Sequence, residues 1–290
     1  MSKKIIVTHH APDLDAITSC WLLKRFDAVC YNQAKVFFVN PGEKLEESKI
    51  IDLKVNLSEV VYVDTGGGPF DHHDKVRALQ MICASSLIYQ QLLIKYPDLK
   101  NDLALKEIID YAIEIDHFRD IYWPQADNVR YLFMLAEIIR GAEFTYLNND
   151  ESQLHFGLTC LDNVYAGLKN FVKARETFKE KGQVFIIKDG RALAIETRND
   201  ELLRFGLKKG LVLVLRKDPV SGIVRIKVNP KSNLKLQNLY QEIIKVDSLG
   251  FWFLHPNQKI LINGSKKNLN QRPTPLTLDF LIKLVKKIYE

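Results

Sequence analysis

Short β-branched runs alternate with helical runs through the first 120 residues of this 290-residue chain, and this alternation restricts its fold more than any other feature. The strand-like runs are KIIVTH (4–9), AKVFFVN (34–40) and EVVYVD (59–64), and the helical runs are DAITSCWLLKRF (15–26), SSLIYQQLLIKY (85–96) and ALKEIIDYAIEI (104–115). Strands that alternate with helices are typical of doubly wound, mostly parallel sheets. We therefore predict an α/β domain of this type over residues 1–150, with Asp15 capping its first helix.

The rest of the chain predicts a connector and a second domain. Apolar periodicity over residues 151–182 indicates one or two helices that end near Gly182. A new series of strand-like and helical runs fills residues 183–290, where the turn sequences KDG and DPVSG predict hairpins. We therefore expect a smaller α/β domain after a helical connector.

The two halves of the chain carry opposite net charges. Residues 1–180 hold 20 Lys and Arg against 26 Asp and Glu, a net charge of −6, whereas residues 181–290 hold 21 against 9, a net charge of +12. An acidic domain that binds cations beside a basic domain suits an anionic, phosphate-containing substrate. The alternative is a solvated surface that is merely rich in lysine.

The composition also bounds the location of the protein. No run approaches the ~20 apolar residues that cross a bilayer, and the start MSKKIIVTHH has too short an apolar stretch for a signal peptide. We expect a cytoplasmic protein without a membrane partner. The four cysteines lie far apart and form no CxxC pair, so neither a zinc knuckle nor a disulfide framework is expected.

Potential metal ligands gather where the strands and one helix of the first domain end. They are His9, His10, Asp13 and Asp15, then Asp64, Asp71, His72 and His73, and finally Asp116 and His117. Ligands of open α/β sheets bind beyond the carboxyl ends of the strands. Carboxylates and imidazoles without thiolates suit Mn²⁺, Mg²⁺ or a similar ion, and a bridging aspartate can hold two such ions. This combination of ligands predicts phosphoesterase chemistry.

Each of these residues also has a purely structural interpretation. Asp13 and Asp15 alone are more typical of an N-cap and a turn than of metal ligands. The glycines at 66–68 either let the backbone approach a phosphate or simply supply positive φ angles in a turn. The joint occurrence of the motifs, rather than any one residue, favours a site.

The order of these motifs resembles that of the DHH phosphoesterase superfamily over roughly residues 4–120. The matching elements are H-x-x-x-D-x-D at His9, Asp13 and Asp15, the isolated Asp64 after a strand, DHH at 71–73, and Asp116 after a helix. Members include RecJ-type exonucleases, family II inorganic pyrophosphatases, oligoribonuclease/phosphoadenosine phosphatases and cyclic-dinucleotide phosphodiesterases. VYVDTGGGPFDHH and FWFLHPNQKILINGS are also similar to segments of the MYG1-type branch, whose first motif differs.

The resemblance implies two Mn²⁺ ions, with Mg²⁺ or Co²⁺ as alternatives, and water activated between them that attacks phosphorus directly. The first ion would be held by His9, Asp13 and Asp64, and the second by Asp15, Asp64, His72 and Asp116. Catalytic roles fall to the bridging Asp64, to His73, which would face the substrate phosphate, and to Asp71, which would orient the adjacent imidazole. His10 would pack or cap nearby.

The resemblance also implies that residues 183–290 bind the substrate, although the GGGH segment of many members is missing. The basic candidates for phosphate contacts are Arg216, Lys217, Arg225, Lys227 and Lys231, and a second group consists of His255, Asn263, Gly264 and Ser265. Arginine can bind phosphate as a fork and lysine as a mobile charge. The alternating VRIKV is equally typical of a strand with one solvated face.

The favoured activity is that of a phosphodiesterase or exonuclease on RNA or DNA ends or short oligonucleotides. Two alternatives stay open, a pyrophosphatase-like hydrolase of a small phosphoanhydride and a non-catalytic nucleic-acid-binding protein whose affinity falls with salt. The expected partner is thus a nucleic acid or nucleotide. The oligomeric state, with a dimer as one option, is left open.

Overall fold

The computed structural model describes residues 4–264 and 272–290, and the chain divides into two compact units. Unit 1 covers residues 1–168 and unit 2 covers residues 169–290. The division lies inside α7 (Asp150–Lys181), a single helix in the segment where a helical connector was predicted. Ser265, one of the predicted substrate contacts, lies outside the described residues.

Unit 1 is built around a three-stranded parallel sheet with the strand order β2-β1-β3. Its strands are β1 (Ile5–His9), β2 (Lys35–Val39) and β3 (Val60–Tyr62). Pairing of His9 with Val39 and of Val7 with Tyr62 brings the carboxyl ends of the strands to one edge. The polar segments that follow β1 and β3 therefore begin at this same edge.

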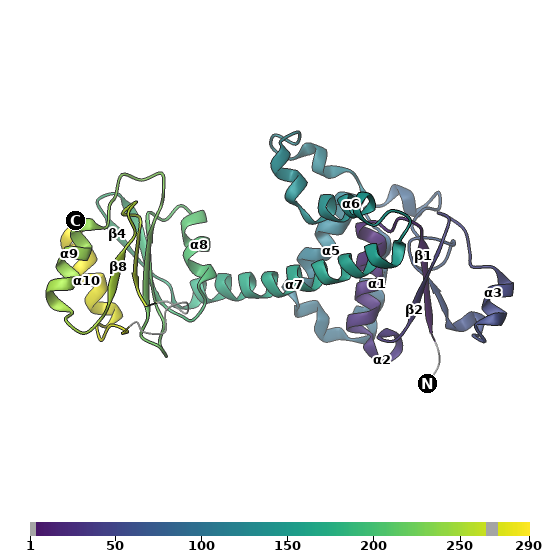
Figure 1. Cartoon of the computed structure of the whole chain (residues 1–290), viewed down its shortest axis with the longest axis horizontal. Coiled ribbons are helices and arrows are strands. Elements are labelled where there is room, and N and C mark those ends of the chain that lie inside the picture. The colour runs from purple at the N-terminus through teal and green to yellow at the C-terminus, as the bar shows by residue number, and fades with distance from the viewer. Residues whose placement is uncertain (1–3, 265–271) are drawn as a thin grey trace. The chain divides into compact units, whose positions relative to one another are not determined.

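Helices cover both faces of the unit 1 sheet (Figure 1). They are α1 (Leu14–Phe26), α2 (Ala28–Tyr31), α3 (Glu47–Asp52), α4 (Ala84–Lys95), α5 (Leu103–Asp116), α6 (Leu135–Thr145) and the first part of α7. Ile5 and Val7 of β1 share a buried cluster with Ile50 of α3 on one face, while α1 lies on the other face (Figure 1). The alternating pattern thus correctly predicted an α/β unit with a parallel sheet.

The first helix is not capped as predicted. Asp13, not Asp15, is the N-cap of α1, and its carboxylate accepts a hydrogen bond from the backbone N–H of Ala16 at 3.0 Å. Asp15 instead accepts from the backbone N–H groups of Ala84 at 2.6 Å and Ser85 at 2.9 Å. The first N–H groups of a helix have no partner within it, so a carboxylate from α1 satisfies the N-terminus of α4.

Unit 2 contains a six-stranded mixed sheet with the order β4-β5-β6-β7-β9-β8. The strands are β4 (Gln183–Ile187), β5 (Gly190–Glu196), β6 (Leu213–Lys217), β7 (Val224–Val228), β8 (Trp252–Leu254) and β9 (Ile260–Asn263). The pairs β4–β5 and β6–β7 are antiparallel, as the two turn sequences predicted, and β5–β6 is parallel. This sheet is therefore mixed, unlike the parallel sheet of unit 1.

Helices also cover both faces of the unit 2 sheet. Its helices besides α7 are α8 (Glu201–Lys208), α9 (Gln237–Val246) and α10 (Leu278–Tyr289). Figure 1 shows α9 and α10 on one face and α8 on the other. The larger apolar cluster joins the sheet to α9 and α10 through side chains such as Leu239 and Leu281, and a smaller one joins it to α8 through Leu202 and Leu203.

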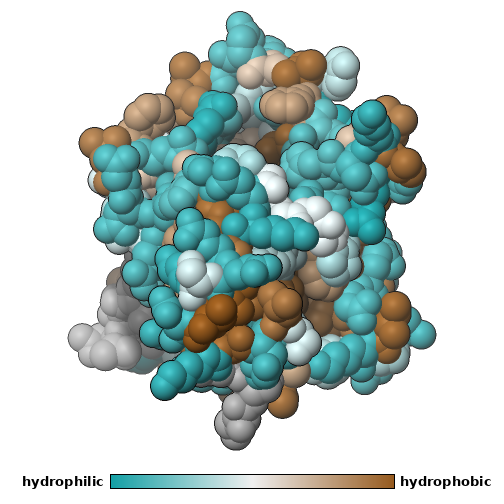
Figure 2. Space-filling model, turned by 90° about the vertical axis from the view of Figure 1, so that its right-hand side faces the viewer, coloured by the Kyte–Doolittle hydropathy of each residue, from teal (hydrophilic) through white to brown (hydrophobic). Residues whose placement is uncertain are grey.

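Other apolar side chains lie at the surface. The face of the molecule in Figure 2 is largely hydrophilic, and its apolar side chains form separate small groups. Within residues 4–264 and 272–290, no helix combines the length and the apolar character that crossing a bilayer requires.

Candidate metal centre

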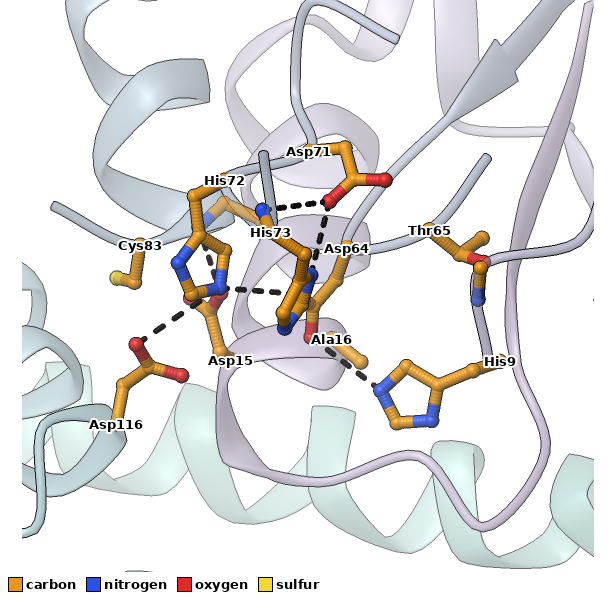
Figure 3. A network of polar contacts seen from close by, with 12 residues as sticks. His9, Asp15, Ala16, Asp64, Thr65, Asp71, His72, His73, Cys83 and Asp116 are labelled. Atoms are coloured by element: carbon orange, nitrogen blue, oxygen red, sulfur yellow. Dashed lines mark hydrogen bonds and ion pairs between the residues drawn. The ribbon is translucent and has the colours of Figure 1, made fainter. Parts of the chain in front are cut away.

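Side chains from four segments of unit 1 meet beyond the carboxyl edge of its sheet (Figure 3). We call them the carboxylate–histidine cluster, which consists of His9, Asp13, Asp15, Asp64, His72, His73 and Asp116. They come from the end of β1, the start of α1, the loop after β3 and the last residue of α5. Segments up to about a hundred residues apart in sequence therefore supply a single cluster.

The loop after β3 turns back on itself and brings Asp64 and His72 together at the centre of the cluster. Asp64, Gly66 and Gly67 have φ angles of 56°, 78° and 66°. Glycine adopts this left-handed region freely, so the glycines serve first as turn residues, as one of the two sequence interpretations held. Gly66 has a second role, because a Cβ there would lie 2.7 Å from Cδ1 of Tyr62. The turn thus requires a glycine at position 66.

Asp64 lies at the centre of the cluster and is 4% exposed. Its Oδ2 lies 3.3 Å from Nε2 of His9, and its Oδ1 lies 3.3 Å from Nε2 of His72 and 3.8 Å from Nδ1 of His73. The two oxygens of one carboxylate therefore lie next to imidazoles from different segments, as Figure 3 shows. This arrangement joins two groups of potential ligands through one residue.

Three sets of ligand atoms lie close enough to hold a metal ion. They are His9–Asp13–Asp64, Asp15–His72–Asp116 and Asp64–His72–His73, each with its ligand atoms within 4.8 Å of one another. Nε2 of His72 lies 3.9 Å from Oδ2 of Asp15 and 3.8 Å from Oδ2 of Asp116. All six residues predicted as metal ligands therefore lie in one place, and His73 adds a seventh potential ligand.

Two central polar atoms of the cluster are buried without a hydrogen-bond partner among the described residues. They are Oδ1 of Asp64 and Nε2 of His72, which face each other but not in hydrogen-bond geometry. Buried polar atoms are nearly always paired, so an unpaired acceptor beside an unpaired ring nitrogen calls for a further partner. A carboxylate oxygen and an imidazole nitrogen are both ligands for divalent cations, and they fit such a partner.

The carboxylates of the cluster lack enough positive charge around them. Burial, followed by the charges of Asp64 and Asp116, raises the pKa of Asp15 to about 7. Burial raises the pKa of Asp116 to about 6, against the opposing charge of His72. Carboxylates in this state favour any bound cation, because a cation removes both the repulsion and part of the desolvation penalty.

The imidazoles have the opposite shift. Burial lowers the pKa of His9, but its contacts with Asp64 and the carbonyl of His10 more than offset this and raise it to about 9. The contact with Asp64 also raises the pKa of His72 to about 9, against burial. Although burial alone would raise the pKa of Asp64, its contacts with His72 and His9 lower it. Without a metal, protons on these imidazoles thus supply the charge that holds the cluster together.

Asp71 and His73 form a hydrogen-bonded pair at the rim of the cluster. Nδ1 of His73 lies 2.8 Å from Oδ1 of Asp71, which also accepts from the backbone N–H of His73 at 3.0 Å, while Oδ2 accepts from Gly67 N–H at 2.7 Å. Although burial raises the pKa of Asp71, these hydrogen bonds lower it below its usual range. Asp71 therefore stays charged and fixes the orientation of the His73 ring, whose side chain is 62% exposed.

The two remaining histidines of the motifs lie outside the three ligand sets. Nδ1 of His10 lies 2.6 Å from Oδ2 of Asp150 at the start of α7, and its ring stacks on Phe38. Nε2 of His117 lies 3.0 Å from the carbonyl oxygen of Ile82, although its side chain lines the adjacent cavity. His10 thus packs nearby, as the spacing predicted.

A cavity of about 520 Å³ opens beside the cluster. It is lined by Asp15, His72, His73 and Asp116, and on its far wall by Glu137 and Arg140 of α6. Neither of these α6 residues was predicted from the sequence. An acid and a base three residues apart are common on solvated helices, and nothing in the sequence distinguishes this pair from them.

The predicted substrate contacts of unit 2 differ in their surroundings. Arg216 is 3% exposed, with Nε 2.9 Å from Oδ1 of Asp200, and Nη1 of Arg225 lies 2.6 Å from Oδ2 of the same aspartate. Asp218 is a second carboxylate beside them, with Oδ2 3.8 Å from Nη1 of Arg216. Two of the predicted cations are thus paired inside unit 2, whereas Lys231 and His255 are exposed and Lys227 is half-buried.

Three other predicted contacts in unit 2 have structural roles. The side chain of Asn263 bonds the backbone of Phe251, Arg272 and Thr274. The φ angle of Gly264 is 86°, which favours glycine at that position. Lys217 donates to the carbonyl oxygen of Leu276. The side chains of Lys217 and Asn263 thus fasten β6 and β9 to the segment before α10.

Comparison with known proteins adds little to this geometry. No protein-family model matches the chain, and no curated protein matches it. One similar solved structure is that of RecJ in complex with Mg²⁺ from Thermus thermophilus, with 12% sequence identity and a TM-score of 0.33. The match covers 98% of this chain and 49% of that one, so the chain spans about half the length of the RecJ chain. Similarity at this level carries no argument about function.

Proposed function

We propose that unit 1 is the catalytic part of a divalent-metal-dependent phosphohydrolase of the DHH type. The observation that supports this most strongly is the position of Asp64, whose two carboxylate oxygens face His9 on one side and His72 on the other. Asp15 and Asp116 complete the second side, and Asp13 the first. Such an array suits two neighbouring cations that share one carboxylate.

The ligand sets divide between two cation positions. His9, Asp13 and Asp64 would hold one ion, and Asp15, Asp64, His72 and Asp116 the other, with Mn²⁺ as the preferred metal and Mg²⁺ or Co²⁺ as alternatives. When bound, such ions lower the pKa of water and neutralise charge on a phosphoryl group. The raised pKa values of Asp15 and Asp116 favour the uptake of cations by the cluster.

The chain's own residues position and orient the reacting groups. A carboxylate can only accept hydrogen bonds, so Asp71 holds a proton of His73 on Nδ1. Nε2 would have to carry a second proton to donate to a phosphate oxygen. The backbone N–H groups of Ala84 and Ser85 hold Asp15 at the N-terminus of α4. Both arrangements fix side chains before a substrate arrives, which is the condition for efficient catalysis.

We further propose that the substrate is a phosphodiester at a nucleic-acid end or in a short oligonucleotide. The net charge of +12 on residues 181–290 favours a substrate with more than one phosphate, and Lys231 is exposed for such a contact. The second domain predicted from the sequence, residues 183–290 after the connector, would then bind the rest of the substrate.

A substrate screen tests the reaction class. Purified full-length protein with Mn²⁺ is offered pyrophosphate, bis-p-nitrophenyl phosphate, dinucleotides and end-labelled single strands. We expect hydrolysis of the phosphodiesters. Activity on pyrophosphate alone would replace the nuclease assignment with that of a pyrophosphatase. Failure on all four, combined with salt-sensitive binding of the strands, would favour a non-catalytic nucleic-acid-binding protein.

The variant Asp64→Asn tests the site itself. Removal of the shared charge should lower phosphodiester hydrolysis by about 10³-fold or more, because both cation positions lose a ligand. Asp52→Asn, at an exposed position at the end of α3, is the matched control and should keep wild-type activity. Calorimetric titration with Mn²⁺ in the absence of substrate gives a second measurement. Normal turnover and normal Mn²⁺ binding in Asp64→Asn would rule out the two-metal site.

A further inference from the structure

A second cavity, of about 330 Å³, adjoins the cavity at the metal centre. It lies between α5, α6 and the segment that joins them, and five residues line both cavities: Ile115, Asp120, Ala136, Glu137 and Arg140. Because these residues line both, the two cavities lie side by side. All its lining residues belong to unit 1.

One side of the second cavity is aromatic. The ring centroid of Trp123 lies 6.3 Å from that of Tyr111, with the planes 25° apart, and 5.4 Å from that of Tyr131. Nε1 of Trp123 donates a hydrogen bond to Oε1 of Glu114 at 2.8 Å, which fixes the orientation of the indole. All three aromatic residues line the cavity, so it offers ordered aromatic surface to a flat ligand.

Carboxylates also line the second cavity. Asp120, Asp127 and Glu137 line it, and Arg140, which pairs with Glu137, is the one Lys or Arg among its described lining residues. Three carboxylates disfavour a phosphate in this cavity, whereas they can accept hydrogen bonds from the N–H groups of a neutral ligand. The ligand that matches both walls is therefore flat, aromatic, uncharged and rich in N–H donors.

Arg140 stands at the junction of the two cavities. Its side chain is 65% exposed and lines both of them. A guanidinium in this position can contact a phosphate that is held at the metal centre while the attached group enters the aromatic cavity. The charge distribution thus assigns phosphate to the first cavity and the attached neutral ring to the second.

We propose that the second cavity binds the nucleobase attached to the reacting phosphate and prefers bases with an exocyclic amino group. This inference rests on the proposed function, since it names the part of the substrate that the catalytic unit itself recognises. Adenine, cytosine and guanine present amino N–H donors to the carboxylates, whereas uracil presents carbonyl oxygens at the corresponding edge. Stacking on Trp123 adds affinity that does not depend on the base.

Binding of mononucleotides to the full chain tests this pocket without any requirement for turnover. Equilibrium dialysis with Mn²⁺ compares AMP, CMP, UMP and ribose 5-phosphate. We expect AMP and CMP to bind more tightly than UMP, and ribose 5-phosphate to bind most weakly. Equal affinity for AMP and ribose 5-phosphate would overturn the proposal, because it would show that only the phosphate is recognised.

Three variants separate stacking from general effects on the fold. Trp123→Ala should weaken AMP binding by about 5- to 100-fold, the range for loss of one stacked base, and Trp123→Phe should retain most of the affinity. The matched control is Tyr122→Ala, which removes a neighbouring aromatic ring that is 80% exposed and does not line the cavity. Equal losses in Trp123→Ala and Tyr122→Ala would overturn the proposal.

The carboxylate wall has its own variant. Asp127→Asn removes one charge at an exposed position and should narrow the preference for AMP over UMP while total binding persists. This measurement decides the question even if Trp123→Ala fails to fold. An unchanged preference in Asp127→Asn would overturn the proposed selection of bases with an exocyclic amino group.

Kinetics on two oligonucleotides distinguish failure of the pocket from failure of the proposed function. One substrate carries a normal terminal base and the other an abasic terminal residue. A higher KM for the abasic substrate, with a similar kcat, supports the pocket. Hydrolysis of both with equal KM would contradict the base pocket but not the proposed phosphohydrolase activity. Trp123-dependent AMP binding without any hydrolysis would support the base pocket and contradict the proposed activity.

Discussion

Both units consist of helices packed on a sheet, but buried carboxylates are crowded together in unit 1, whereas buried charges in unit 2 lie in ion pairs. In unit 1, parallel strands end at one edge, where several aspartates lie around Asp64. Burial, followed by repulsion from the other carboxylates, raises the pKa values of Asp15 and Asp116 there. In unit 2, the buried guanidinium of Arg216 is neutralised by Asp200 within the same unit. Unit 1 therefore has a deficit of positive charge, and unit 2 has a closed internal pair.

This difference identifies where a ligand is needed. In an ion pair each charge is offset by its partner, so no net charge is left for a bound ion to offset. A cluster of carboxylates with raised pKa values lowers the stability of the folded unit until a cation or protons arrive. Perturbed titration beside a cavity thus supports the proposed metal site in unit 1.

The largest expected contrast is in the pH dependence of stability without metal. An aspartate whose folded-state pKa is raised stabilises the fold at low pH, and for Asp15 that stability is lost between its usual value of 3.8 and about 7. A histidine with a raised pKa behaves in the same direction, so the contributions of His9 and His72 are lost between 6.5 and about 9. Unit 1 in EDTA should therefore lose on the order of a few kcal/mol between about pH 5 and 9.

Unit 2 should stay nearly constant over the same range. Although burial raises the pKa values of Asp218 and Asp247, hydrogen bonds lower both below 3.8, and that stability is lost only at more acidic pH. Hydrogen–deuterium exchange of β1 and β7 peptides in increasing urea at pH 5, 7 and 9 measures both units in one sample. Addition of Mn²⁺ should flatten the profile of unit 1. Parallel profiles for the two units in EDTA would contradict the charge deficit.

A substitution within the closed pair of unit 2 should have a smaller effect. Asp200→Asn leaves the buried Arg216 and the neighbouring Arg225 without their shared carboxylate, and it should destabilise unit 2 by about 1–3 kcal/mol. Asp189→Asn, in the exposed turn between β4 and β5, is the control. The urea midpoint of the β7 peptides checks this expectation. A lower urea midpoint for the β1 peptides instead of the β7 peptides would mean that the pair does not stabilise unit 2.

The smallest effect concerns the glycine turn that places Asp64. Gly67→Ala puts a side chain at a φ of 66° with no atom within 4 Å of the new Cβ, so it should cost only the backbone penalty of about 1 kcal/mol. Gly66→Ala adds a contact of 2.7 Å with Tyr62 and should cost more. Thermal unfolding of unit 1 compares the two. Equal costs would show that Tyr62 moves freely and does not constrain the turn.

The sequence predicted those features that depend on local patterns. The alternation of strands and helices predicted the α/β class, the turn sequences predicted two hairpins, and the resemblance of the motifs to a known superfamily implied six ligands that the structure brings together. The cap of α1 was assigned to the wrong aspartate, since both Asp13 and Asp15 are good N-cap residues by type. The choice between them depended on α4, whose N-terminus lies next to Asp15 only in the folded chain.

Residue types and their order by themselves determined that this chain carries a carboxylate and histidine site at the end of a parallel sheet. Only the tertiary structure decided that Asp15 accepts hydrogen bonds from the N-terminus of α4, that Arg216 is paired with Asp200, and that Trp123 and Arg140 lie near the site. The physical reason is that charge and hydrogen-bond partners act over a few ångströms in space. The partners of Asp15 and Arg216 lie 69 and 16 residues away along the chain, where local sequence holds no information about them.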